Sequence, residues 1–125
     1  MSTAVFIRSE SADYYLYSFE ETLNEKYMCD VDRAGNGLDG FILCQETKYD
    51  FIITDHKMPF MTGAAFIAGV RTRKNLNMKT GVLMLTGFLT PELKTKVGLP
   101  DVEYMSKPID FKKLFEVVSS YVYTY

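Results

Sequence analysis

The sequence has 125 residues, of which 47% are hydrophobic and 24% charged, the size and composition of one globular domain with a buried core. Fourteen basic residues against sixteen acidic ones give a formal net charge of −2, which excludes the basic stripe typical of nucleic-acid binding. Two cysteines and one histidine exclude a disulfide framework and a multi-histidine metal site. No apolar run is long enough to span a membrane and the N-terminus has no secretory leader, so we expect a cytoplasmic protein.

In the first half of the chain, short apolar runs alternate with segments of helical period. The first helical segment has Tyr15, Phe19 and Leu23 at intervals of four residues, and the turn-forming residues 34–37 precede the second. The pattern predicts a strand Thr3–Ile7, a helix Ala12–Asn24, a strand Met28–Val31, a helix Leu38–Glu46 and a strand Tyr49–Thr54.

The same alternation continues in the second half. Thr90 before Pro91 is typical of a helix start, because threonine caps the first turn and proline suits the first helical position. Asp110 is a second candidate cap. The pattern predicts a helix Gly63–Arg73, a strand Gly81–Thr86, a helix from Pro91 to near Gly98, a strand Val102–Met105 and a final helix after Asp110.

Five strands alternating with five helices indicate βαβ units, which form a parallel sheet covered on both faces. The continuous apolar runs Phe51–Ile53 and Val82–Leu85 are typical of central strands buried on both sides. The predicted fold is therefore α/β, a doubly wound five-stranded parallel sheet flanked by five helices. Since the chain has no internal repeat, low-complexity tract or linker composition, we expect residues 1–125 to form one domain.

Three polar side chains come directly at the ends of predicted strands: Asp55, Thr86 and Lys107. The carboxyl ends of parallel strands meet at one edge of the sheet, where ligands of this architecture bind. A carboxylate there is a nucleophile toward phosphorus, and a hydroxyl and an ammonium group stabilise phosphoryl oxygens. The set predicts a phosphoryl-accepting site, at which a divalent cation would neutralise the charge that accumulates during transfer.

The segment Asp55–Gly63 reads DHKMPFMTG and resembles the D-x-x-M-P-x-M-[DST]-G signature of response regulator receiver domains. The resemblance extends to Thr86-Gly87, to the segment Tyr104–Pro108 and to the turn Asn36-Gly37, and so covers nearly the whole chain. It implies the flavodoxin-like receiver fold.

The resemblance also implies roles for individual residues. Asp55 would be the phosphoacceptor, Thr86 would hydrogen-bond the phosphoryl group, and Lys107 would pair with that group or with Asp55. Tyr104 would be the switch residue, whose side chain changes rotamer when Thr86 moves. The peptide bond between Lys107 and Pro108 is expected to be cis, which is inexpensive only before proline.

The chain departs from the family pattern where receivers carry two adjacent acidic residues after the first strand. Here the stretch is Ile7-Arg8-Ser9-Glu10-Ser11, with one acid. The implied Mg²⁺ ligands are Glu10, Asp55 and the backbone carbonyl of Lys57, a set that predicts weakened or lost Mg²⁺ binding. An inward-pointing Arg8 would replace the metal charge.

The expected function is that of a stand-alone response regulator receiver and not of an enzyme. Asp55 would take a phosphoryl group from a histidine kinase or phosphotransfer protein. A downstream partner would bind the face formed by the helix from Pro91, the strand Val102–Met105 and the helix after Asp110. We expect a monomer or weak homodimer that binds neither nucleic acid nor membrane.

Two alternatives remain at this point. The first is a phosphorylation-independent pseudo-receiver that serves as a protein-interaction or dimerisation module, which the missing acidic pair favours. The second is an aspartate-nucleophile phosphatase. Such enzymes usually have a second aspartate two residues after the nucleophile, where this chain has Lys57.

Overall fold

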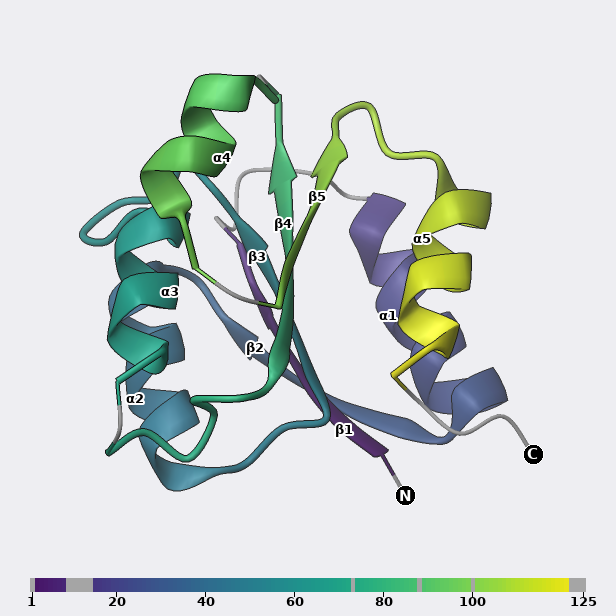
Figure 1. Ribbon diagram of the computed structural model, residues 1–125. Coiled ribbons are helices and arrows are strands. Elements are labelled where there is room, and N and C mark those ends of the chain that lie inside the picture. Colours follow the sequence, from purple (N-terminus) through teal and green to yellow (C-terminus); the bar gives the residue numbers. More distant parts are fainter. Residues whose placement is uncertain (1, 9–14, 73, 88, 100, 122–125) are drawn as a thin grey trace.

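The computed structural model describes residues 2–8, 15–72, 74–87, 89–99 and 101–121. Over these residues, five parallel strands form one sheet in the order β2-β1-β3-β4-β5, with a helix after each strand. Helices α1 and α5 cover one face of the sheet, and α2, α3 and α4 cover the other (Figure 1). The prediction of a doubly wound α/β fold is confirmed.

The elements follow the predicted order. They are β1 (Ser2–Ile7), α1 (Tyr15–Tyr27), β2 (Cys29–Ala34), α2 (Gly37–Glu46), β3 (Phe51–Asp55), α3 (Gly63–Val70), β4 (Gly81–Thr86), α4 (Pro91–Val97), β5 (Val102–Ser106) and α5 (Phe111–Ser119).

Some boundaries differ from the expected ones, for local reasons. β2 runs three residues past its predicted end because it pairs with all of β1, up to Ile7 opposite Ala34. α3 ends three residues early, and the Arg71 guanidinium instead donates hydrogen bonds to the carbonyls of Asn77 and Met78. The predicted start of the first helix at residue 12 lies outside the described residues.

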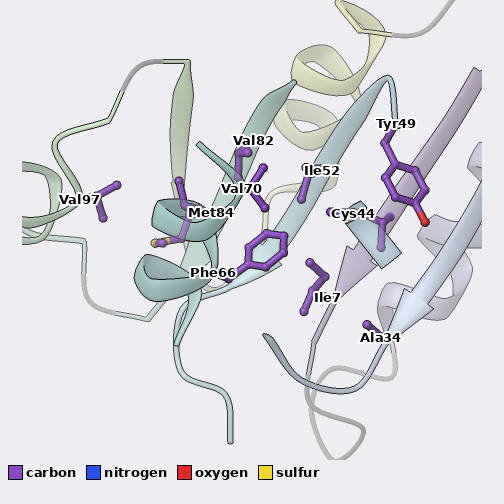
Figure 2. Packing of buried hydrophobic residues seen from close by; sticks show 12 residues of the cluster. Ile7, Ala34, Cys44, Tyr49, Ile52, Phe66, Val70, Val82, Met84 and Val97 are labelled. Carbon is purple, nitrogen blue, oxygen red and sulfur yellow. The ribbon is translucent and has the colours of Figure 1, made fainter. Parts of the chain in front are cut away.

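Alternation along the central strands sends side chains to two separate cores. Phe51 and Ile53 of β3 point toward α1 and α5, whereas Ile52, between them, points toward α2, α3 and α4. Figure 2 shows the second core, in which Phe66 of α3 packs near Ile52 and Ile7. These two cores fix which side chains of each strand point to which face of the sheet. They therefore also fix the face to which the last residue of each strand points.

The two cysteines are buried on opposite faces of the sheet, Cys29 against α1 and Cys44 against α3. Burial raises the pKa of the Cys29 thiol to about 11 and that of Cys44 to about 12. A raised pKa keeps a thiol protonated, and the thiolate is the reactive form. We therefore expect neither thiol to react with Ellman's reagent at about pH 8 in the folded protein, and both to react after unfolding in guanidinium chloride. Rapid labelling of one thiol in the folded protein would contradict the burial.

Candidate functional site

Asp55 is the last residue of β3, the central strand of the sheet, and only 3% of its surface is exposed. Its strand continues to pair with β4, with Asp55 opposite Leu85, and the following His56 N–H donates to the Leu85 carbonyl at 3.1 Å. The chain places β2 on one side of β1 and then β3, β4 and β5 on the other side, so the direction of strand addition reverses between β1 and β3. Ligands of doubly wound sheets bind at this switch point. The carboxylate is therefore held at the carboxyl edge by rigid, paired backbone.

Lys107 and Thr86 lie beside Asp55, as predicted. The Lys107 ammonium nitrogen Nζ is 3.1 Å from Oδ1 of Asp55, and three-quarters of the lysine side chain is buried. The Lys107 N–H donates to the Thr86 carbonyl at 2.8 Å, which extends the pairing of β5 with β4. The peptide bond between Lys107 and Pro108 is cis, as expected. An anionic oxygen, a cation and a hydroxyl thus share one site.

The three side chains line one cleft of about 490 Å³. Its other lining residues come from the end of β4, from the loops after β3 and β4 and from the start of α4, and are His56, Lys57, Leu85, Gly87, Thr90 and Leu93. Among the described residues that line this cleft, Asp55 is the single carboxylate. Glu10, the other predicted carboxylate ligand of the metal, lies outside the described residues.

The loop after Asp55 folds back onto the end of β3. The Gly63 N–H donates to the His56 carbonyl at 2.7 Å, and the Thr62 side chain caps α3 by accepting from the Ala65 N–H. A Cβ on Gly63 would collide with the Asp55 carbonyl oxygen, so only glycine permits this approach. Phe60, 86% exposed, has a φ of +69°, a costly backbone conformation for a residue with a side chain.

The two methionines of the signature are packing residues. Met58 and Met61 are partly buried against the core formed with α2, α3 and α4. Gly37, in the turn that resembles the family pattern, touches Met61 so closely that a Cβ would lie 2.8 Å from the methionine Cβ. The signature therefore encodes the shape of the loop that presents Asp55.

Tyr104 does not line the cleft. It is a half-buried residue of β5 opposite Met84, and it packs with the core on the α4 side of the sheet. The Lys94 ammonium group of α4 lies 5.7 Å from the centre of its ring, a cation–π arrangement. Burial raises the pKa of the Tyr104 hydroxyl, which keeps it protonated.

Sequence reasoning considered an inward-pointing Arg8 but missed the charged cluster to which this residue belongs. Arg8 Nε lies 3.4 Å from Oε1 of Glu20 on α1, and Arg33 Nε of β2 lies 3.1 Å from Oε2 of the same carboxylate. The side chains of Arg8 and Glu20 are 2% and 8% exposed. The available signal for Glu20 was its position directly after Phe19, a residue of the apolar stripe of the first helix.

This geometry is that of a doubly wound α/β domain whose cleft, at the carboxyl end of the central strand, brings together an aspartate, a lysine and a threonine. Residues 13–119 match the family model of the response regulator receiver domain. The chain belongs to this family.

The curated relatives of the chain are longer proteins, and the chain matches a part of each. It is 31% identical over 104 residues to the probable transcriptional regulator ycf29 of Porphyra purpurea, covering 79% of this chain and 49% of the relative. It is 35% identical over 85 residues to the transcriptional regulatory protein CusR of Escherichia coli K12, and the match covers 67% of this chain and 36% of CusR. A hybrid signal transduction histidine kinase of Dictyostelium discoideum is 29% identical over 74% of this chain, which is 3% of the kinase. The chain therefore spans less than half the length of these relatives.

Solved structures have the same fold over almost the whole chain. The chemotaxis protein CheY4 of Vibrio cholerae superposes with a TM-score of 0.82 at 24% identity, covering 97% of this chain and 98% of CheY4. The receiver domain of sensor histidine kinase PA1611 from Pseudomonas aeruginosa superposes with a TM-score of 0.76 at 15% identity, and the match covers 96% of each chain. That structure was solved with a magnesium ion in its active-site cleft. In the described part of the chain, no helix has the length and apolarity that a bilayer span requires.

Proposed function

We propose that this receiver domain accepts a phosphoryl group on Asp55 from a histidine kinase or phosphotransfer protein and signals through a partner protein. The buried carboxylate with Lys107 Nζ at 3.1 Å is the observation that carries the proposal. We further propose that residues 1–125 form one receiver domain that acts in the cytoplasm by binding partners, as a monomer or weak homodimer, and not as an enzyme.

The chemistry follows from the cleft. An Asp55 carboxylate oxygen attacks phosphorus, and the bond from phosphorus to the leaving atom breaks, with its electron pair remaining on that atom. The acyl phosphate carries about −1.5 to −2 charges where the carboxylate carried −1. Lys107 pairs with this added charge, and Thr86 donates its hydroxyl to a phosphoryl oxygen.

The described residues fit a magnesium ion poorly. Mg²⁺ takes oxygen ligands, usually from one or two carboxylates. Among the described residues that line the cleft, Asp55 has the single carboxylate, and this carboxylate is already paired with Lys107. No group of three or more His, Cys, Asp or Glu side chains with metal-binding spacing occurs in the described part of the chain. Glu10, Asp55 and the Lys57 carbonyl remain the proposed ligands of a weak or lost site.

The readout would run from Thr86 to the face formed by α4, β5 and α5. Thr86 ends β4 and precedes α4, and Tyr104 lies opposite Met84, two residues before Thr86. A shift of Thr86 toward the phosphoryl group would move the start of α4 and change the packing of Tyr104, which Lys94 contacts. The partner would bind the surface that changes.

The test is the intact mass of the protein after incubation with acetyl phosphate or phosphoramidate, two small donors that need no docking surface. We expect a gain of one phosphoryl group in the parent protein and none in Asp55→Asn, because an amide is not a nucleophile toward phosphorus. Circular dichroism of both proteins shows whether the variant keeps the fold.

Two results would contradict the proposal. A phosphoryl group that persists in Asp55→Asn would place the modification on another residue. No gain from either donor, in folded protein with and without Mg²⁺, would favour the pseudo-receiver alternative, in which the same fold serves as a constitutive interaction module.

A further inference from the structure

The ammonium group of Lys94, on α4, lies over the ring of Tyr104, on β5. Its nitrogen Nζ is 5.7 Å from the ring centre, within the range of a cation–π interaction. The lysine side chain is exposed, whereas Tyr104 is half-buried on the edge strand of the sheet. Within the described part of the chain, this ring is the one group that the Lys94 ammonium contacts. The contact therefore joins α4 to β5 at the surface of the domain.

α4 is a short helix that few side chains anchor to the core. It has seven residues, and among its described side chains Val97 is the one that is buried. Leu93 is partly buried against the same core. Elements with few buried apolar contacts are the ones that move most easily in a folded domain. One further contact at the surface, that of Lys94, is therefore a substantial part of what fixes the position of this helix.

The first turn of α4 connects the cleft of Asp55 to Lys94. Thr90, which caps the helix, and Leu93 both line the cleft, and the Leu93 N–H donates to the Thr90 hydroxyl at 3.2 Å. Lys94 follows Leu93 directly, and its N–H donates to the Thr90 carbonyl at 3.3 Å. Tyr104, in contrast, belongs to a strand that is paired with β4 along its whole length. A displacement of the first turn of α4 therefore moves Lys94 relative to the ring.

The contact belongs to the arrangement in which Asp55 is an unmodified carboxylate. In this arrangement Lys107 Nζ is 3.1 Å from Oδ1 of Asp55, and Lys94 lies over Tyr104. A contact that is made in one arrangement and lost in another favours the first by its own interaction free energy. For an exposed cation–π pair this corresponds to about a two- to fivefold change in an equilibrium constant.

We propose that Lys94 restrains the response of the domain to phosphorylation: its contact with the Tyr104 ring stabilises the unphosphorylated position of α4 and is released when Asp55 is phosphorylated. Lys94 is a positioning residue, because it does not line the cleft and acts through α4. This inference rests on the proposed function and adds to it the residue that sets how readily α4 moves.

The contact is measured first without phosphorylation, by NMR of protein with ¹³C-labelled lysine. Protons above the face of an aromatic ring are shifted upfield, so the ε-methylene signal of Lys94 reports its position over Tyr104. We expect an upfield-shifted signal in the parent protein that is absent from Lys94→Met, is kept in Tyr104→Phe and returns to the usual position in Tyr104→Leu. Lys113, an exposed lysine of α5, provides the reference signal.

Acetyl phosphate is then added, and the intact mass gives the phosphorylated fraction. We expect the upfield shift to diminish in proportion to that fraction and to persist in Asp55→Asn. Lys94→Met is expected to gain mass about two- to fivefold faster than the parent protein, because the arrangement that accepts the phosphoryl group is more populated without the contact. Lys94→Arg, which keeps a cation over the ring, and the control Lys113→Met are expected to react at the parent rate.

Three results would each overturn the inference and leave the proposed function standing. They are an unshifted Lys94 signal in the parent protein, an upfield shift that persists in the phosphorylated protein, and equal rates for Lys94→Met and the parent. The second of these would make the contact purely structural. If no sample gains a phosphoryl group on Asp55, the proposed function fails, and the inference fails with it even where the first measurement detects the contact.

Discussion

Replacing Gly63 with alanine is expected to destabilise the domain and to slow phosphorylation of Asp55. The added Cβ would meet the Asp55 carbonyl oxygen and lie 3.0 Å from the His56 Cα, and both are backbone atoms that cannot rotate away. Relief requires the loop after β3 to move off the strand end, at a cost of about 1–3 kcal/mol in the free energy of unfolding. Since the same backbone positions the acceptor carboxylate, we expect at least about a tenfold lower rate with acetyl phosphate.

Gly87 provides the matched control for stability. A Cβ added there would have no heavy atom within 4 Å, and the residue is exposed. Gly87→Ala is therefore expected to stay within about 0.5 kcal/mol of the parent protein in urea unfolding. An unchanged midpoint and an unchanged rate for Gly63→Ala would mean that the loop shifts without cost, and that the glycine of the signature does not position Asp55.

Replacing Glu20 with glutamine is expected to cost about 3–5 kcal/mol in the free energy of unfolding, because it removes a carboxylate that pairs with the buried Arg8 guanidinium. The estimate applies since the Glu20 and Arg8 side chains are 8% and 2% exposed and solvent screens them little. Urea unfolding monitored by circular dichroism measures the loss. Glu21→Gln, at the next and exposed position of α1, is the control and should change stability by less than about 0.5 kcal/mol.

A double variant separates the charge from the packing. Apolar residues of similar volume often replace a buried ion pair without loss, so Arg8→Met combined with Glu20→Leu is expected to recover much of the stability that Glu20→Gln loses. A loss below about 1 kcal/mol for Glu20→Gln would show that water reaches the pair, and that the cluster behaves like a surface salt bridge.

Local sequence was sufficient to predict helix starts and central strands, because capping hydrogen bonds and short apolar runs involve only neighbouring residues. Thr90 and Asp110 cap their helices as predicted, with side-chain oxygens that accept from the Leu93 and Lys112 N–H groups. The continuous apolar run of β4 predicted a strand buried on both faces, and the residues from Val82 to Thr86 are buried. These features need only a few consecutive residues, because capping and alternation are local.

The edge strand β2 was predicted too short because its local sequence has no strand pattern. Its sequence CDVDRA carries three charges and exposes half of its side chains, so no apolar pattern marks it. Six consecutive residue pairs with β1, a segment about 27 residues away in the chain, hold it in the sheet. Pairing with a distant strand cannot be read from the strand itself.

The sequence by itself determined the order of the elements, the doubly wound class and the three residues that meet in the cleft, Asp55, Thr86 and Lys107. Motif spacing and the parallel direction of the strands are enough to bring such strand ends to one edge. The tertiary structure alone decided that Arg8 pairs with Glu20, twelve residues away on a helix packed against the strand. That pairing depends on how α1 crosses the sheet and on which side chains exclude water, and both are properties of the packed domain.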